Sequence, residues 1–438
     1  MLAVGVLIDL KWCPEAGGQV KCWESLAKAA MAFQEEVDLT VHFLGDREEA
    51  FIISENVRYI THPPLLSTAW FRFLNRIPEH TDLAPFHPRL FPYLKNYDVI
   101  HTTNVSFALA KTAFSFVKRS STPLVNSIHT DNPRYARLYS AEVIRKLFKD
   151  GQLSRLLLDR FRFDERCASF MVRKLDRYLK RCDWVLVSKE EDWERISRVF
   201  PKKRISFLRR GIDKGTFHPK WRDRERLYKA FRIPPDRFLL LFVGRVDQGK
   251  NVMTLAEAAK ILLDRDEPIH VMVVGEGSQK EAIRTHLGPH VTLPGVVPHS
   301  TLAWLYASAD LFVFPSEIEV CPNVVIEAKA SGLPVLVPAR GGAAQCLKKQ
   351  GVDGFILKEN SPERWAQAIE SLQRSPTRRA RMGQEARKHI ESEWPSWGEV
   401  LANDLIPVWR AVAKERRPTD QPKRTKTKGD GDEDRICP

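Results

Sequence analysis

Two kinds of hydrophobic pattern alternate along the whole chain. Short runs that are apolar nearly throughout, typical of buried strands, are separated by segments in which apolar residues recur with helical spacing. In the first half the strand-like runs cover residues 2–9, 37–45, 98–104, 123–130 and 183–189, and a helix is predicted over 19–34. In the second half the alternation is cleaner, with strand-like runs at 238–245, 269–277, 291–295, 310–316 and 334–339.

This alternation predicts an α/β fold with parallel sheets covered by helices on both faces. A chain of 438 residues is too long for one ordinary core, which indicates two domains. Gly, Pro and charged residues interrupt the pattern over 211–225, so we place the boundary near 208–220. The predicted units are an N-terminal Rossmann-like domain (1–208), a C-terminal one (219–393), a helix (394–415) and a disordered polar tail (416–438).

Residues 133–181 form an unusual segment rich in Arg, Lys, Leu and Phe, which predicts one or two amphipathic helices. Such a segment can lie in a lipid interface with its apolar side down. It can equally be a pair of helices that packs on the N-terminal domain with its arginines solvated. Both interpretations remain open from the sequence.

Composition narrows the class of protein. No apolar run reaches the roughly 18 residues of a membrane-spanning helix, and the start MLAVGVLIDL has no basic n-region, so it predicts a first strand rather than a signal peptide. The cysteines show no C-x-x-C spacing, so neither a disulfide framework nor a zinc site is indicated, and a reducing cytosol is expected. They stand at positions 13, 22, 167, 182, 321, 346 and 437.

The formal net charge is +14. A charge of this sign attracts polyanions or an anionic membrane leaflet, although a solvated basic surface explains it as well. The basic segments carry no aromatic stacking platform, so no nucleic-acid partner is expected.

Arg245 and Lys250 follow a buried strand in the stretch FVGRVDQGKN, with Asn251 in position to cap a helix that begins at Val252. In open parallel sheets, ligands bind beyond the carboxyl ends of the strands. A guanidinium and an ammonium beside a helix N-terminus suit a diphosphate. The plain alternative is two surface cations in a strand-to-helix loop.

A second group lies in PSEIEVCPNVVIEAKASGLPVLVP (315–338). A helix is predicted to start near Asn323 as its N-cap, with Glu319 in the preceding loop and Glu327 in about the first turn. Carboxylates accept hydrogen bonds from sugar and ribose hydroxyls, and the backbone N–H groups of 322–325 suit phosphate. Dipole compensation would explain Glu327 alone but not Glu319. The two carboxylates could also be the acid–base pair of a glycoside hydrolase, but a hydrolase has no use for a cationic diphosphate site.

Three weaker signals point to the same kind of site. Gly275 lies in GEGS after another strand, where glycine allows close backbone approach, although ordinary turn chemistry rivals this reading. Gly17 and Gly18 follow the first strand and precede a helix, which suits a loop that approaches a diphosphate. His129 ends a predicted strand and is placed to hydrogen-bond a reacting sugar, although a single histidine is more often structural.

Taken together, these motifs resemble the family-four retaining glycosyltransferases, which have the GT-B fold of two facing Rossmann-like domains with a cleft between them. The resemblance rests on FVGRVDQGKN, VVGEGSQKEAI, residues 293–338 and HTDNPRYA, with Gly17–Gly18 and RRGIDKGTFHP (209–219). It implies that the 394–417 helix crosses back to the N-terminal domain. Two departures are Cys321–Pro322 and Gly249–Lys250, where relatives often carry Phe-Gly or Pro-Gly and Glu-Lys.

The resemblance also implies roles for the residues above. Arg245 and Lys250 would neutralise the departing nucleoside diphosphate, Glu327 would hold the ribose, and Glu319 would contact the transferred sugar. His129 would donate to a sugar hydroxyl, and Gly18 would let its loop reach the diphosphate. Pro322, Asn323, Val324, Gly17 and Gly275 complete the expected donor site. No metal or other cofactor is expected, because cations and a helix dipole stabilise the charge.

The expected enzyme transfers a sugar from a nucleotide-sugar, with GDP-mannose and UDP-glucose both compatible, to a glycan or lipid-linked acceptor. The HTDNPRY segment most resembles family members that glycosylate lipids, polyprenol carriers or surface glycans. With the basic stretch after it, this resemblance implies an acceptor at the cytoplasmic leaflet and a cytoplasmic protein, peripheral at the inner face of the plasma membrane. The main alternative is a non-catalytic nucleotide-sugar or glycan-binding protein on the same scaffold. A GT-B phosphorylase is a further alternative, but phosphorylases are much longer and use a pyridoxal phosphate lysine.

Overall fold

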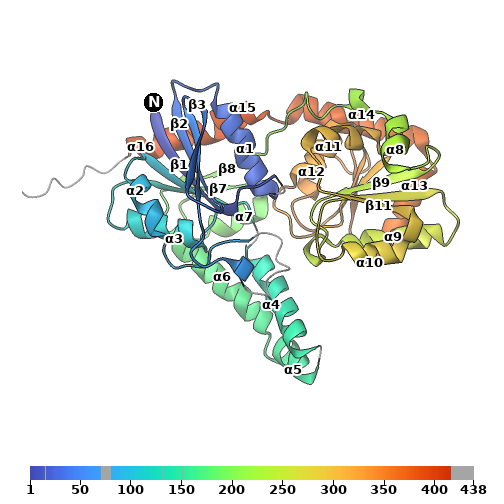
Figure 1. Ribbon diagram of the computed structural model, residues 1–438, viewed down its shortest axis with the longest axis horizontal. Helices are drawn as coiled ribbons and strands as arrows, with labels where there is room; N and C mark the ends of the chain where they lie inside the picture. Colours follow the sequence, from blue (N-terminus) through green and yellow to red (C-terminus); the bar gives the residue numbers. More distant parts are fainter. Residues whose placement is uncertain (15, 71–79, 131, 150, 416–438) are drawn as a thin grey trace, which may run out of the picture.

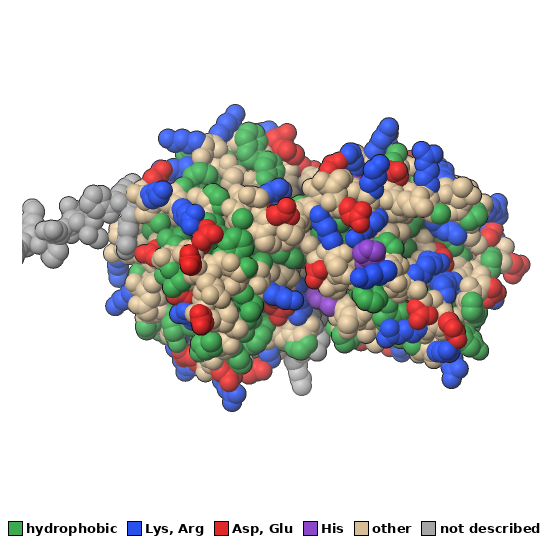
Figure 2. All heavy atoms as spheres, turned by 90° about the horizontal axis from the view of Figure 1, so that it is seen from above, with side chains coloured by type: hydrophobic (Ala, Val, Ile, Leu, Met, Phe, Trp, Pro, Cys, Tyr) green, Lys and Arg blue, Asp and Glu red, His purple; other side chains and the backbone are tan. Residues whose placement is uncertain are grey.

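The computed structural model describes residues 1–14, 16–70, 80–130, 132–149 and 151–415. Its two lobes each hold one twisted sheet between helices, and they lie side by side along the long axis (Figure 1). Seen from above, Lys and Arg side chains are spread over both lobes rather than gathered into one patch (Figure 2). On this face the arrangement fits the solvated-surface explanation of the positive charge.

The N-terminal lobe contains an eight-stranded sheet in the order β3-β4-β2-β1-β5-β6-β7-β8, parallel except for the antiparallel β3–β4 pair. Its central strands are fully buried because helices cover both faces. The strands are β1 Leu2–Lys11, β2 Val37–Leu44, β3 Glu49–Ser54, β4 Val57–His62, β5 Val99–Thr102, β6 Leu124–Ser127, β7 Trp184–Val187 and β8 Ile205–Phe207. The helices are α1 Gly18–Ala30, α2 Phe91–Leu94, α3 Ala108–Val117, α4 Asn132–Phe148, α5 Gln152–Arg155, α6 Phe163–Leu179 and α7 Glu190–Ile196.

The C-terminal lobe contains a six-stranded, fully parallel sheet in the order β11-β10-β9-β12-β13-β14. The strands are β9 Phe238–Val243, β10 Ile269–Val274, β11 Val291–Gly295, β12 Leu311–Val313, β13 Val335–Pro338 and β14 Phe355–Leu357. The helices are α8 Arg224–Phe231, α9 Val252–Leu263, α10 Lys280–Leu287, α11 His299–Ser308, α12 Asn323–Ala330, α13 Pro362–Gln373 and α14 Pro376–Glu393. The predicted α/β class with two parallel-sheet domains is therefore confirmed.

The end of the described chain returns to the N-terminal lobe. Helices α15 (Trp397–Val400) and α16 (Ile406–Lys414), joined by a π-helical turn, place Leu401, Leu405 and Trp409 in the same apolar core as β1, β2 and α1. Arg209 forms an ion pair with Asp404 (2.6 Å), which fixes this helix against the segment that leaves β8. The two lobes are thus joined by two crossings of the chain.

The 133–181 segment forms a helical hairpin made of α4, α5 and α6. Helices α4 and α6 pack against each other, and the hairpin projects from the N-terminal lobe with α5 at its tip (Figure 1). The base of α4 lies against the C-terminal lobe, where Arg134 donates to the backbone carbonyl of Glu317 (3.0 Å). The predicted amphipathic helices are present, and only their base is held between the lobes.

Candidate functional site

Two adjoining cavities lie where the carboxyl ends of the two sheets face each other. Their volumes are about 880 Å³ and about 460 Å³, and both are lined by Gly17, Gly18, Arg245, Asn323 and Val324. Gly275 and Glu327 line only the larger cavity, whereas His129, Lys250, Glu319 and Pro322 line only the smaller one. The structure therefore brings all the residues singled out from the sequence to one cleft, from elements far apart in the chain.

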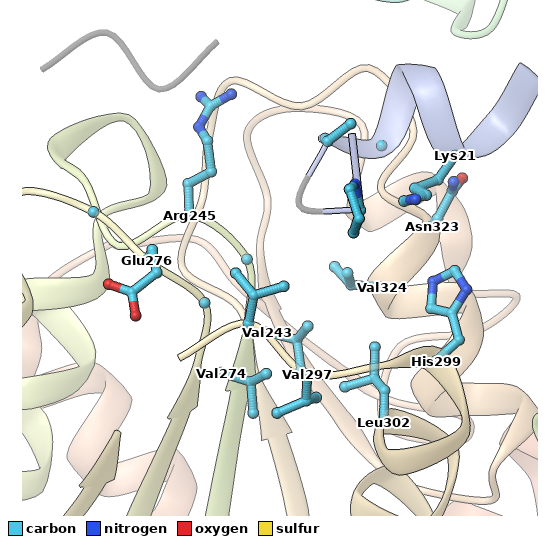
Figure 3. Close-up of a pocket in the computed structure, with 18 of the residues that line it drawn as sticks. Lys21, Val243, Arg245, Val274, Glu276, Val297, His299, Leu302, Asn323 and Val324 are labelled. Carbon is cyan, nitrogen blue, oxygen red and sulfur yellow. The ribbon is translucent and has the colours of Figure 1, made fainter. Parts of the chain in front are cut away.

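The larger cavity has an apolar floor and polar walls (Figure 3). Val243 and Val274 end β9 and β10, and Val297 and Leu302 lie beside them at the bottom. Arg245 extends on one side, while Lys21 of α1 and Asn323 of α12 lie together on the other. This space has an apolar surface for a flat ring and cationic groups for phosphate.

Arg245 is positioned by its own loop and by α4. Its Nε donates to Asp247 Oδ2 (3.1 Å), and its Nη2 donates to the hydroxyl of Tyr135 (3.4 Å), which ties the C-terminal loop to the N-terminal lobe. Asn251 occupies the N-cap position of α9, which begins at Val252 as predicted, but its side chain does not cap the helix. Its backbone is left-handed (φ 52°), and its side chain donates to the Pro315 carbonyl instead. Asp247 caps the turn instead, accepting from the backbone N–H of Lys250 (3.2 Å).

Lys250 and Glu319 form a close ion pair within the smaller cavity. Burial alone would raise the pKa of Glu319, but Lys250 and Arg245 outweigh it, so the pKa is lowered and the side chain is a carboxylate. Burial alone would lower the pKa of Lys250, but the attraction of Glu319 outweighs burial, so the pKa of Lys250 lies above its usual value. Ser316 donates to the same carboxylate oxygen (3.0 Å). The pair thus places one positive and one negative charge in the smaller cavity.

Helix α12 begins at Asn323, where the sequence predicted its start, but Asn323 is not its cap. Pro322 occupies the N-cap position and has no N–H to offer, and Asn323 is the first helical residue, without a side-chain cap. The N–H of Val325 bonds to the Pro322 carbonyl (3.2 Å), so the donors available to a ligand are those of Asn323 and Val324. The expectation of donors across 322–325 is corrected to these two.

Glu327 is the fifth residue of α12, beyond the first turn, so dipole compensation does not explain it. The side chain is 9% exposed and accepts a hydrogen bond from the hydroxyl of Tyr306 (3.0 Å). Burial raises its pKa to about 7. A buried carboxyl with a single neutral donor has spare acceptor capacity toward the larger cavity.

The glycines differ in what they contribute. A Cβ on Gly275 would lie 1.9 Å from the Gly244 carbonyl oxygen, and its φ is +135°, so the close approach of two strand ends itself requires glycine. The turn-chemistry alternative accounts for this residue. Gly18 starts α1, and a Cβ there would meet no atom within 4 Å, so its bare backbone faces the open cleft.

His129 is held in a buried chain of hydrogen bonds. Arg210 Nη1 donates to its Nδ1 (3.0 Å), its Nε2 bonds to Ser127 Oγ (2.8 Å), and Ser127 also bonds to His101. Burial, then Arg210 and His101, hold the pKa of His129 well below its usual value. The ring is therefore neutral with its proton on Nε2, and both ring nitrogens are engaged within the protein.

Three residues of the cleft were missed. Lys21 and His299 line the larger cavity and Arg210 the smaller one. Lys21 lies in the helix predicted over 19–34, which spans Gly18–Ala30, and it could have been assigned to the cleft from its place one turn after Gly18. Nothing in the sequence pattern distinguishes His299 from a surface histidine at a helix start.

Comparison with known proteins assigns the class. Residues 223–389, which make up the C-terminal domain from α8 to α14, match the family model of the glycosyl transferases group 1. The match is confined to this domain, and the architecture of the whole chain is the GT-B fold. The expected fold of two facing Rossmann-like domains is therefore confirmed.

Three similar proteins extend the comparison. A sulfoquinovosyl transferase of Arabidopsis thaliana is 25% identical over 336 residues, covering 74% of this chain and 60% of that protein. The chain thus spans less than two thirds of the length of this curated relative. The structure of a sucrose-phosphate synthase from Thermosynechococcus elongatus superposes with a TM-score of 0.67 at 18% identity, covering 95% of this chain and 97% of the other. Anabaena HepE, solved with UDP and glucose, gives 0.62 at 16% identity, covering 95% and 99%.

Proposed function

We propose that the chain is a retaining glycosyltransferase that moves a sugar from a nucleotide-sugar to a glycan or lipid-linked acceptor. The observation that carries the proposal is the convergence of Arg245, the two free N–H groups of α12 and the bare backbone of Gly18 on one cavity. Cationic groups and helix N–H groups are the natural ligands of a diphosphate. The related HepE structure contains UDP and glucose, which supports a uridine diphosphate donor such as UDP-glucose alongside GDP-mannose.

The chemistry follows from where the charges lie. As the sugar–phosphate bond breaks, negative charge grows on the leaving diphosphate, and Arg245, Lys250 and the α12 N-terminus stabilise it where it develops. Glu319 lies on the sugar side, in the smaller cavity, and accepts from sugar hydroxyls. The acceptor attacks from the face that the diphosphate leaves, which retains the anomeric configuration, and we assign no protein nucleophile.

A thermal-shift screen tests the proposal. UDP, GDP, ADP and their sugars should be compared, because a ligand that binds only the native state raises its stability, by about 2.7 kcal/mol at a hundred times its Kd. One nucleotide series should raise the melting temperature, and EDTA should leave both this shift and donor turnover nearly unchanged. Absence of a shift with every nucleotide would contradict a donor site. Turnover lost on chelation and restored by manganese would contradict the metal-free mechanism.

Glu327 predicts how donor affinity depends on pH. Its pKa is about 7 in the structure, and two ribose hydroxyls can bond to it only as a carboxylate, so the donor binds the ionised form. Affinity should therefore fall as pH drops below about 7, approaching tenfold per unit. Calorimetry with the intact nucleotide-sugar measures this without interference from a terminal phosphate. Glu327→Gln should bind weakly and without this pH dependence; an unchanged pH profile in this variant would remove Glu327 from the ribose site.

We further propose that the hairpin of α4, α5 and α6 holds the enzyme at the cytoplasmic face of an anionic membrane, where a lipid-linked acceptor resides. None of the helices in the described ranges is long and apolar enough to cross a bilayer. The hairpin instead exposes apolar and basic side chains together, as interfacial helices do. Its exposed apolar residues are Leu147, Phe148, Leu153, Leu156, Phe161, Phe163 and Phe170. Its exposed basic residues include Arg145, Lys149, Arg155, Arg160 and Arg162.

Vesicle co-sedimentation tests the membrane proposal. Each basic residue near an anionic surface contributes about 1 kcal/mol, so replacing Lys149, Arg155, Arg160 and Arg162 with Gln should abolish most of the binding. Binding should require anionic lipid and weaken with salt. The matched control replaces Lys229, Lys260, Arg381 and Lys388, four exposed cations of the other lobe, with Gln. Unmodified protein that stays in the supernatant with anionic vesicles at low salt, or equal loss in the control, would leave the hairpin as simple packing.

A further inference from the structure

Among the residues that the structure describes, Arg210 is a buried cation without a carboxylate counter-ion. Arg210 is 5% exposed, and its guanidinium forms no ion pair with any carboxylate in the described ranges. Arg210 Nη1 donates to two neutral groups, Cys22 Sγ (3.0 Å) and His129 Nδ1 (3.0 Å). The thiol of Cys321 is a further neighbour, and its pKa is lowered by a hydrogen bond with Cys346 and by Arg210. The Nε–H is buried with no hydrogen-bond partner. A buried charge left in this state costs several kcal/mol.

Two half-buried cations of the cleft and the fully buried Lys329 of the C-terminal lobe differ in this respect. Lys250 is paired with Glu319, Arg245 with Asp247, and Lys329 with Asp353. Each of these pairs is complete within the chain. Arg210 is therefore unlike its neighbours, and its missing counter-charge is expected from a ligand.

The place of Arg210 limits what that ligand is. It lines the smaller cavity, together with His129, Lys250 and Glu319, and does not line the larger cavity where a nucleoside diphosphate fits. A second hydrogen-bond donor lines the same cavity. The hydroxyl of Tyr139 is also buried and has no hydrogen-bond partner among the described residues. The anion that Arg210 lacks is thus separate from the diphosphate and lies on the side of the transferred sugar and the acceptor.

Arg210 is also held rigidly. It lies in the segment that leaves β8, where the N–H of Leu208 bonds to the Val187 carbonyl (2.7 Å) and that of Ile212 to the Pro395 carbonyl (3.1 Å). A Cβ on the next residue, Gly211, would lie 2.6 Å from the ring of Trp397. Tight packing on both sides pre-organises the guanidinium, which favours the geometric recognition that Arg gives to carboxylate and phosphate groups.

We propose that Arg210 binds an anionic substituent, a carboxylate, sulfonate or phosphate, carried by one of the two sugar substrates. The identity of the substrate in this inference rests on the proposed glycosyl transfer. The existence of an anion site at Arg210 does not depend on that function. Either source presents the same chemistry to the guanidinium. An anionic donor sugar would reach it from the larger cavity, and an anionic acceptor would reach it through the smaller one.

Two binding experiments on the full chain separate these sources. In the first, calorimetry compares UDP-glucose with UDP-glucuronate, which differ only in the carboxylate. In the second, glycerol 3-phosphate or sulfate is titrated into protein saturated with UDP. The neutral counterpart is UDP-glucose in the first experiment and glycerol in the second. In one of the two experiments, the anionic probe should bind about tenfold to a hundredfold more tightly than its neutral counterpart, which is the scale of charge-assisted hydrogen bonds.

The preference should disappear in Arg210→Met and persist in Arg209→Gln, which alters the neighbouring cation that is already paired with Asp404. Circular dichroism checks that Arg210→Met folds. Arg210→Lys keeps the positive charge but loses the planar pair of guanidinium N–H groups, so it should retain part of the preference. If the wild type prefers the anion in neither experiment, or Arg210→Met keeps the preference, the proposal is overturned. If no nucleotide binds yet sulfate binds through Arg210, the anion site stands and the glycosyltransferase proposal fails.

Discussion

Replacement of Lys250 or Arg245 by Ala should each reduce turnover of the nucleotide-sugar by about 100-fold or more. This is the scale of losing one preorganised electrostatic donor to a developing charge. Both cations line the cleft, Arg245 in both cavities and Lys250 in the smaller one. The assay is release of the nucleoside diphosphate, which needs no knowledge of the acceptor when water or a mixed lipid fraction takes the sugar.

Because Lys250 is paired with Glu319, its removal leaves a buried carboxylate uncompensated, and stability has to be measured beside activity. A folded Lys250→Ala protein with normal turnover would remove the lysine from the mechanism. Lys229→Ala is the control, since this lysine is 70% exposed and paired with Glu225 far from the cleft. Its turnover should equal that of the wild type.

Lys329→Ala should lower the free energy of unfolding by about 3–5 kcal/mol, the cost of breaking a buried ion pair by removing one partner. Lys329 lies on α12 with its ammonium fully buried. The ammonium donates to the Cys346 carbonyl (2.5 Å) and to Asp353 Oδ2 (2.6 Å), and it lies 2.6 Å from His389 Nδ1. Without Lys329, the Asp353 carboxylate stays buried and loses the ammonium group that pairs with it. Urea unfolding measures the loss.

The same network predicts a dependence on pH. Burial raises the pKa of Asp353, but His389 and Lys329 outweigh burial and the net pKa is lowered. A carboxyl whose pKa is depressed in the folded state adds stability above its unfolded pKa of about 4, and this stability is lost as pH falls below that value. The difference between wild type and Lys329→Ala should therefore shrink in acid. Lys260→Ala, which breaks an exposed pair with Asp264, should cost less than about 1 kcal/mol; a similar cost for Lys329→Ala would contradict the account.

The strands that the sequence predicted are those buried on both faces. Runs such as FLLLFV in β9 are continuous because helices cover the sheet on each side. Three of the missed strands lack this signal: β3 alternates and leaves Ile52 74% exposed at the sheet edge, while β8 and β14 have three residues each. The fourth, β4 (VRYITH), lies inside the sheet and is buried, but polar residues interrupt its apolar run, so the β3–β4 hairpin was missed as a whole.

The site was predictable where a residue type and its position after a strand coincide, as for Arg245 and Glu319. It was not predictable where the role depends on a tertiary partner. Arg210 stands in the RRGID stretch that was noted only for its resemblance, and nothing in sequence shows that Arg209 finds Asp404 while Arg210 finds no carboxylate. Likewise, the engagement of both His129 ring nitrogens depends on Ser127 and Arg210, which only the fold brings together.

The central claim is that a nucleotide-sugar binds in the cleft between the lobes, mainly on the C-terminal one. Hydrogen exchange with and without the nucleotide that stabilises the chain tests it most directly, because it locates the site without requiring turnover. Protection should appear in residues 243–250, 274–278, 296–302 and 319–327, and in 16–21 of the N-terminal lobe, because these segments contribute the lining of the two cavities. Protection confined to other segments, or none under saturating nucleotide, would contradict the account.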